Sequence, residues 1–177
     1  MSKVLLLIAS KSYQPFEYGE PKRILEEAGH QIITVSDKVG VAQAVYDGSS
    51  VQVDLSLDEV SIDNGDALFL IGGHGALDYL DNEKTYNLLQ AWQKSGKPYG
   101  AICISPRILA KAGVLKNKKA TGWDKDNKLA EIFEKEGVEY VRENVVVDGN
   151  VITGNGPGAA EEFGEKIVKI IRNKKTD

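Results

Sequence analysis

Short apolar runs alternate with helical patterns along this chain, and this alternation constrains its fold more than any other feature. Three of the runs are rich in apolar residues, as is typical of strands buried on both faces of a parallel sheet: Val4–Ala9, Ala67–Ile71 and Lys97–Ile102. Helical patterns fall between and after them. The sequence therefore predicts an α/β sandwich with a mainly parallel sheet.

Turn and helix-end signals place the other elements. Pro21 is predicted to open the first helix, which ends at Gly29, and Gln31–Val35 is the next predicted strand. The remaining predicted elements are a small hairpin of 45–46 and 51–54 around Asp47-Gly48 at one side of the main sheet, helices over about 83–94 and 128–136, strands at 145–147 and 151–153, and a closing helix to about Arg172.

Composition narrows the function classes. A length of 177 residues fits one domain, which we place at 1–177. With 22 basic and 26 acidic residues the net charge is −4, and the lysines are scattered, so nucleic acid is not an expected partner. A single cysteine forms no internal disulfide, and we find neither a signal-peptide pattern nor a membrane-length apolar run. We expect a cytoplasmic protein without membrane association, whose thiol stays reduced.

Cys103 is the most informative polar residue. It stands where the apolar run at 97–102 gives way to a helix-starting run at 104–109. A side chain at such a turn projects from the carboxyl edge of the sheet, beside helix amides that favour an anion. Small residues, Ala101 and Ser105, permit the tight turn that an exposed nucleophile requires. The alternative is a buried thiol that packs as a small hydrophobe.

Four features follow predicted strands and are therefore expected to meet at the carboxyl edge of the sheet, where ligands bind in such folds. They are the loop with Glu17, the glycine loop 72–75, Cys103 and the glycine loop 154–158. The last loop lacks the lysine of a phosphate-binding loop. One cysteine and two distant histidines show no metal-ligand spacing, so we predict neither a metal nor a cofactor.

Taken in order, these pieces resemble the ThiJ/PfpI superfamily over nearly the whole chain. The segments that carry the resemblance are Pro-Phe-Glu-Tyr at 15–18, Gly-Gly-His-Gly at 72–75, the elbow at 101–106 continuing to Ala-Gly-Val-Leu at 112–115, and the stretch 156–163. The resemblance implies a flavodoxin-like three-layer α/β/α sandwich and a nucleophilic cysteine. It also implies a homo-oligomer, dimer or hexamer, to which the hairpin at 45–53 would contribute.

The resemblance further implies an acidic side chain from the first loop that is hydrogen-bonded to the cysteine, and Glu17 matches it. A protonated Glu17 would donate to the thiolate and lower the pKa of Cys103, while partial burial would raise its own pKa. The amides of Gly73 and Ile104 are expected to hold an oxyanion, although the glycines equally serve a sharp turn. Trp123 and Tyr18 are expected to line the pocket mouth, with loop packing as the alternative.

The chain departs from the resemblance at the histidine. Protease-like members place histidine directly after the cysteine, where this chain has Ile104, and the counterpart of the other family histidine lies near 121–124, which has none. His74 is the remaining candidate for a base or a substrate contact, and a structural hydrogen bond is the alternative. Asp124 and Asp126 are candidates for acids that support the site from outside; the alternative is a helix N-terminus, because Asp126 and Asn127 are good capping residues, and we assign neither aspartate a catalytic role.

The Cys103–Glu17 pair predicts a cysteine-dependent enzyme that acts on a small-molecule carbonyl substrate, in the manner of a glyoxalase or deglycase. A redox or stress sensor, in which Cys103 is oxidised without turnover, is the alternative. Peptide hydrolysis is a third possibility, weakened because amide cleavage needs a general acid that Ile104 cannot provide.

Overall fold

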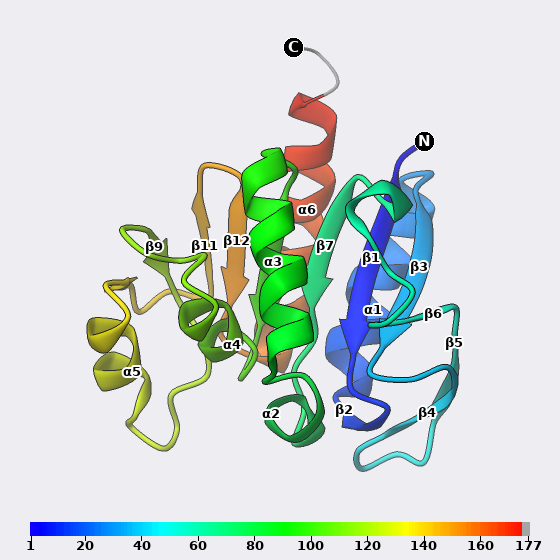
Figure 1. The fold of residues 1–177 in the computed structure, drawn as a ribbon, viewed down its shortest axis with the longest axis horizontal. Coiled ribbons are helices and arrows are strands. Elements are labelled where there is room, and N and C mark those ends of the chain that lie inside the picture. The colour runs from blue at the N-terminus through cyan, green and yellow to red at the C-terminus, as the bar shows by residue number, and fades with distance from the viewer. Residues whose placement is uncertain (175–177) are drawn as a thin grey trace.

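The predicted apolar runs form neighbouring strands at the centre of the sheet in the computed structural model, which describes residues 1–174 (Figure 1). β1 (Lys3–Ile8), β7 (Ala67–Leu70) and β8 (Tyr99–Ile102) pair in parallel and are buried on both faces, apart from the exposed Lys3. The seven-stranded sheet has the order β11-β12-β8-β7-β1-β3-β6, and only β11 and β12 pair antiparallel. Its other strands are β3 (Gln31–Ser36), β6 (Leu55–Ser56), β11 (Val145–Asp148) and β12 (Val151–Gly154).

Helices cover both faces of this sheet, which confirms the predicted three layers (Figure 1). α1 (Pro15–Glu27) and α6 (Ala160–Asn173) pack together on one face. The opposite face carries α2 (Gly75–Tyr79), α3 (Glu83–Ser95) and α4 (Pro106–Lys111), and α5 (Leu129–Lys135) packs against α4 at one end. Alternate side chains of β1 enter two separate cores, with Leu5 and Leu7 on the α3 side and Leu6 and Ile8 on the α1 side.

The first helix begins earlier than predicted. Gln14 caps α1, and its side-chain oxygen accepts hydrogen bonds from the amides of Phe16 and Glu17 at 2.6 and 3.0 Å. Pro21 therefore lies inside the helix, where it packs against Gly164 of α6: a Cβ at Gly164 would lie 3.1 Å from the Cα of Pro21. Glu17 consequently belongs to the first turn of a helix and not to a loop.

The hairpin differs from its predicted boundaries. Its strands are β4 (Gly40–Ala44) and β5 (Ser50–Val53), and with β2 (Lys11–Tyr13) they form a separate three-stranded sheet. Val45 and Tyr46, predicted as a strand, lie in the connection, and the φ of 76° at Tyr46 is incompatible with a strand. The side chain of Asp47 accepts from the amide of Ser49 and closes the turn.

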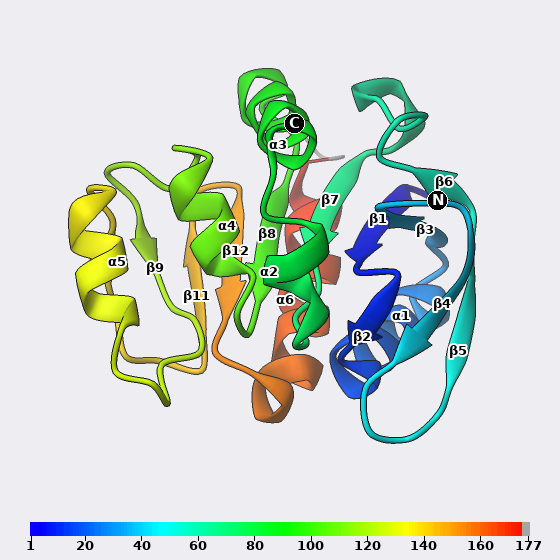
Figure 2. The same ribbon diagram turned by 60° about the horizontal axis from the view of Figure 1, so that its bottom comes forward.

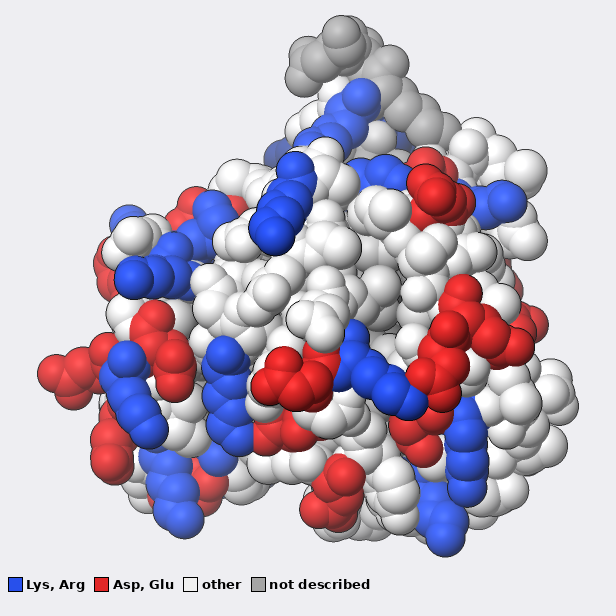
Figure 3. Space-filling model, viewed as in Figure 1, with Lys and Arg blue, Asp and Glu red and all other residues white. Residues whose placement is uncertain are grey.

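Short elements complete the fold. β9 (Lys119–Ala120) and β10 (Glu139–Tyr140) pair in parallel near α5, and two single-turn helices occupy Ile62–Asn64 and Pro157–Ala159. Figure 2 shows the hairpin sheet and the α5 segment at opposite ends of the molecule, with the carboxyl ends of the central strands between them. Basic and acidic side chains are interspersed on the face in Figure 3. Among residues 1–174 no helix has the length and apolar character needed to cross a bilayer.

Candidate active site

Cys103 forms a sharp elbow between β8 and α4. Its φ of 65° lies in the left-handed region, which is strained for a residue with a side chain. Neighbouring elements hold the strained backbone on both sides: its N–H donates to the carbonyl of Gly154 at 2.9 Å, and its carbonyl accepts from the N–H of Trp123 at 2.7 Å. The buried Ser105 hydroxyl donates to the carbonyl of Ile71 at 2.7 Å. The elbow predicted from the small flanking residues is present.

Glu17 reaches the elbow from the first turn of α1. Its side chain is fully buried, and Oε2 accepts the N–H of Gly72 at 3.0 Å. A Cβ placed on Gly72 would lie 2.5 Å from this oxygen and 3.1 Å from Cys103 Sγ, so the carboxyl and the thiol meet across Gly72. The other carboxyl oxygen, Oε1, has no nitrogen or oxygen partner within residues 1–174. The structure thus brings together the two side chains that the resemblance paired.

Burial is the strongest influence on both members of this pair. It raises the pKa of Glu17 from 4.5 to about 7, although hydrogen bonds from Cys103 and from Gly72 favour the carboxylate. Burial, followed by the negative charge of Glu17, also raises the pKa of the Cys103 thiol. This direction applies to a pair in which Glu17 is ionised, and the lowering of the thiol pKa by a protonated Glu17 stays a prediction. Because two negative charges at such close range are unfavourable, we expect the pair to retain one proton near neutral pH.

Two backbone amides point at the sulfur. The N–H groups of Gly73 and Ile104 donate to Cys103 Sγ and partly oppose the effect of burial on its pKa. Gly73 has a φ of 113°, and a Cβ there would lie 2.4 Å from the carbonyl oxygen of Ser12. Gly73 is therefore needed for the turn, and the same turn aims its amide at the sulfur. The turn interpretation of the glycine loop is confirmed at Gly73, and the role of its amide in holding an oxyanion stays a prediction.

Replacing Gly72 with alanine tests how tightly the pair is packed. The added methyl group would lie 2.5 Å from both Cys103 Cβ and Glu17 Oε2, so we expect a loss of about 1–3 kcal/mol in the free energy of unfolding and slower Cys103 alkylation. Urea denaturation and alkylation rates measure both effects. Gly158→Ala is the matched control, because a Cβ there meets nothing within 4 Å. Equal stabilities of the two variants would contradict the close packing.

An open cavity of about 1040 Å³ lies above the elbow. Its lining includes Glu17, Gly73, His74, Cys103, Ile104 and Trp123, so these predicted site residues share one cavity. Tyr18 is absent from that lining: it is buried in the core beside Tyr13, and its hydroxyl is 2.7 Å from Thr34 Oγ1. This placement gives Tyr18 a packing role and does not support its predicted place at the pocket mouth.

His74 lies at the rim, exposed, at the start of α2. Its Nε2 is 2.8 Å from the hydroxyl of Tyr46, and the two rings meet edge to face with centroids 5.5 Å apart. Tyr46 also lines the cavity, on the tip of the hairpin. The hydrogen bond foreseen as the structural alternative for His74 is thus present, and it leaves the imidazole beside the opening.

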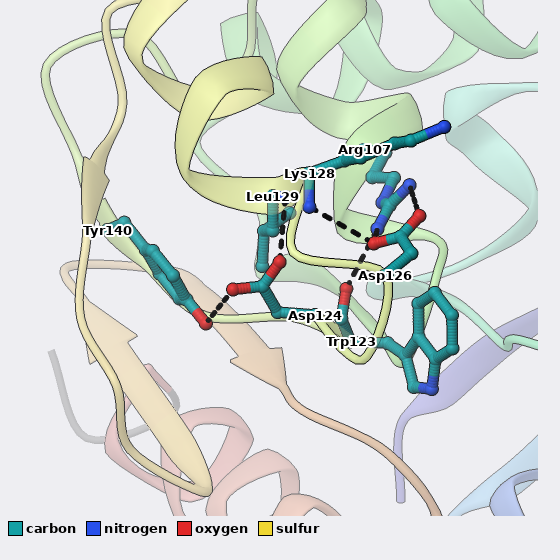
Figure 4. Close-up of polar contacts among 7 residues, drawn as sticks. All are labelled: Arg107, Trp123, Asp124, Asp126, Lys128, Leu129 and Tyr140. Carbon is teal, nitrogen blue, oxygen red and sulfur yellow. Dashed lines mark hydrogen bonds and ion pairs between the residues drawn. The ribbon is translucent and has the colours of Figure 1, made fainter.

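Several lining residues were not anticipated. Arg107, on α4 one turn past the cysteine, is 6% exposed, and its guanidinium forms two hydrogen bonds with Asp126 (Figure 4). Tyr140 donates to Asp124, which also accepts the amide of Leu129, the first residue of α5, at 2.8 Å. Asp126, one of the two residues predicted to cap this helix, accepts the amide of Lys128 at 3.2 Å. The sequence signal that could have identified Arg107 is its position beside Pro106, in a helix whose other residues are mostly apolar.

Comparisons with known proteins agree with this architecture. The model of the DJ-1/PfpI family matches residues 2–170. A Methanocaldococcus jannaschii protein is 36% identical over 171 residues, which are 96% of this chain and 82% of that protein. Deglycase PfpI of Pyrococcus furiosus is 34% identical over 168 residues, 95% of this chain and 99% of that one. The crystal structure of a ThiJ/PfpI domain protein from Brachyspira murdochii has a TM-score of 0.91 at 28% identity, covering 97% of this chain and 96% of that chain.

The structural match extends over all three layers and confirms the flavodoxin-like sandwich. The sequence matches span the glycine loop, the elbow and the segment that carries Glu17. The chain belongs to the DJ-1/PfpI family.

Proposed function

We propose that this protein is a cysteine-dependent enzyme that acts on small reactive carbonyl compounds, in the manner of a glyoxalase or deglycase. The observation that carries the proposal is the pairing of the buried Glu17 with the partly exposed Cys103 on the cavity lining, with two backbone amides directed at Sγ. The name of the Pyrococcus furiosus relative, a deglycase, supports the same class of chemistry.

The proposed reaction converts a 2-oxoaldehyde and water into a 2-hydroxy acid. Cys103 Sγ, as the thiolate, forms a bond to the aldehyde carbon, and the carbonyl π electrons move to oxygen, which takes the proton held by Glu17. The amides of Gly73 and Ile104 stabilise the oxyanion. The Glu17 carboxylate then removes the proton from that carbon, and the electrons of the C–H bond form an enediolate as the neighbouring carbonyl oxygen takes the negative charge. Glu17 returns the proton to the neighbouring carbon while the hydroxyl proton passes to the neighbouring oxygen, which leaves a 2-hydroxy thioester. Water hydrolyses the thioester, releasing the 2-hydroxy acid and restoring the Cys103 thiol.

Glu17 suits this role because its proton is exchangeable near neutrality. With a pKa of about 7, it is present in both protonation states under physiological conditions. Its burial beside the sulfur keeps the proton within the pair. The single shared proton therefore supplies both the donor for the oxyanion and, after transfer, the base for the carbon.

The direct test is lactate formation from methylglyoxal, before and after Cys103 is blocked with iodoacetamide. Intact mass spectrometry establishes that one acetamide group has been added to the one thiol in the chain. We expect turnover by the untreated protein and its loss in proportion to the blocked fraction. Turnover that is unchanged after complete blocking would overturn the proposal.

We propose His74 as a substrate contact at the rim of the same cavity. His74→Gln is expected to raise KM about threefold to tenfold with kcat retained, because an interaction made equally in the ground and transition states is lost. Tyr46→Phe is the matched control, since it removes only the hydroxyl that bonds His74 Nε2. A fall in kcat without a change in KM would instead assign His74 the role of a base.

A redox sensor is the second candidate, and the identity of residue 104 favours it. Ile104 packs against the core where a histidine base would stand, so within residues 1–174 the carboxyl of Glu17 is the side-chain partner of the sulfur for proton transfer. Two equivalents of peroxide would oxidise Cys103 to the sulfinic acid and be reduced to water. Oxidation of Cys103 no faster than that of an unfolded peptide thiol, measured by intact mass, would count against a sensor.

Peptide hydrolysis has less support. Cleavage of an amide needs an acid for the leaving amine, and the side chain of Ile104 is apolar and packed against the core. The family relationship alone is the argument for it. Release of a peptide from casein by the wild type but not by a Cys103 variant would revive it.

A further inference from the structure

The loop between β9 and α5 contributes residues 121–127 to the lining of the cavity. It is tied directly to the nucleophile, because the N–H of Trp123 donates to the carbonyl of Cys103 at 2.7 Å. Trp123 itself is partly buried and lines the cavity together with the cysteine. Any movement of this loop therefore changes the space above Sγ.

Arg107 fastens this loop to the helix that follows the elbow. Its Nη1 and Nη2 donate to the two carboxylate oxygens of Asp126 at 3.0 and 2.6 Å, and Nη2 also donates to the carbonyl of Trp123 at 3.1 Å. The guanidinium carbon lies 5.5 Å from the centre of the Trp123 ring. One planar group thus makes a bidentate ion pair, a backbone contact and a ring contact within the same loop.

Arg107 is the buried partner in these contacts, whereas Asp126 lies at the surface. The side chain of Arg107 is 7% exposed and that of Asp126 is 29% exposed, and the guanidinium holds the pKa of Asp126 below its ordinary value. Arg107 Nε is buried without a hydrogen-bond partner within residues 1–174. A buried cation in this position needs the Asp126 carboxylate to compensate its charge. The planar guanidinium of arginine can make all these contacts at once, which the ammonium group of lysine cannot.

We propose that Arg107 is a positioning residue that holds Trp123 as a wall of the cleft and so limits the size of the molecule that reaches Cys103. Its guanidinium makes its contacts with the loop and not with the reacting sulfur. The inference rests on the proposed function only in taking this cleft as the reaction site. It predicts that the Arg107–Asp126 contact controls access to the thiol.

The test compares two thiol reagents of different size, iodoacetamide and fluorescein maleimide, each rate being divided by its rate with free cysteine. In Arg107→Met we expect the ratio of large-reagent to small-reagent reactivity to rise about tenfold, the effect of losing one charge-assisted bidentate contact on the loop's opening equilibrium. Arg107→Lys retains the positive charge but not the planar guanidinium, so its reactivity ratio should lie between those of the wild type and Arg107→Met. Lys111→Met is the matched control on α4, because Lys111 pairs with the distant Asp81.

Trp123 fluorescence gives a second readout that does not depend on Cys103. Of the two tryptophans, Trp92 is fully buried, so increased acrylamide quenching in Arg107→Met would report Trp123. A raised reagent ratio together with increased quenching supports the inference. If the same protein turned over no methylglyoxal, that result would contradict the proposed function and leave the role of Arg107 supported. An unchanged ratio, or equal acceleration of both reagents by general loosening, would overturn it. Arg107→Lys keeps the comparison available if Arg107→Met fails to fold.

Discussion

Replacing Cys103 with serine is expected to lower the turnover of methylglyoxal by about a thousandfold or more, because the nucleophile of the proposed reaction is lost. A serine hydroxyl remains protonated near neutral pH, because the Glu17 carboxylate cannot remove its proton as it can remove the proton of a thiol. Serine is almost isosteric with cysteine, so the positions of Glu17 and of the Gly73 and Ile104 amides should be preserved. Lactate formation under saturating substrate measures the change.

The control for this substitution is a measurement of whether Cys103→Ser still folds. Cys103 has a strained φ of 65° that its neighbours impose through the carbonyl of Gly154 and the amide of Trp123, and serine makes the same backbone contacts. We therefore expect the thermal midpoint of Cys103→Ser to stay close to that of the wild type. A folded variant that retains wild-type turnover would show that the reaction occurs elsewhere.

The central sheet could be predicted from sequence because strands buried on both faces require continuous apolar runs. β1, β7 and β8 satisfy this condition, and each was found at its predicted place. The elbow was predictable for a related reason: small residues flank a polar one at a strand end. Local signals were sufficient where the structure depends on local composition.

The pairing of Glu17 with Cys103 required a different kind of information. The two residues are distant in sequence, and neither composition nor spacing connects them, so the prediction came from the resemblance to a family. The start of α1 was misplaced because Pro21 gives a strong local helix-start signal, whereas the true cap is Gln14. Close packing of Pro21 on Gly164 is a tertiary contact that no local pattern announces.

Charge interactions at the site were the least predictable part. Arg107 and Asp126 sit on different elements, and although Arg107 stands in an otherwise apolar helix, no local pattern connects it with Asp126. Likewise, the direction of the Cys103 pKa depends on how deeply the thiol is buried and on which partner holds the proton. Burial is a property of the assembled fold, so the sequence identified the two residues but not how the fold sets the pKa of the thiol.

Replacing Glu17 with glutamine is expected to make the protein more stable at high pH. Below pH 4.5 the carboxyl is protonated in both folded and unfolded chains, so its pKa has no effect on stability there. Between 4.5 and about 7 the unfolded chain releases the proton while the folded chain keeps it, and wild-type stability falls as pH rises. Above about pH 7 the carboxyl is ionised in both states, and the wild type keeps the full loss of stability that comes from burying the charge of Glu17.

The difference between a pKa of 4.5 for Glu17 in the unfolded chain and about 7 in the folded chain corresponds to about 3 kcal/mol in the free energy of unfolding. The stability gain of Glu17→Gln over the wild type should therefore grow by that amount from pH 4 to pH 8, measured by urea denaturation at each pH. Glu162→Gln, which removes a carboxylate with an exposed ion pair, is the control and should show little change. A gain independent of pH would mean that Glu17 ionises as readily in the folded protein as in the unfolded one.

The same variant decides how the pair divides its proton. Because the negative charge of Glu17 raises the pKa of the Cys103 thiol, Glu17→Gln should lower that pKa and speed alkylation at neutral pH, while turnover falls for want of a proton carrier. A rise in the thiol pKa would instead show that protonated Glu17 stabilises the thiolate by donating to it. Alkylation rates across pH thus separate a site that stores its proton on sulfur from one that stores it on carboxyl.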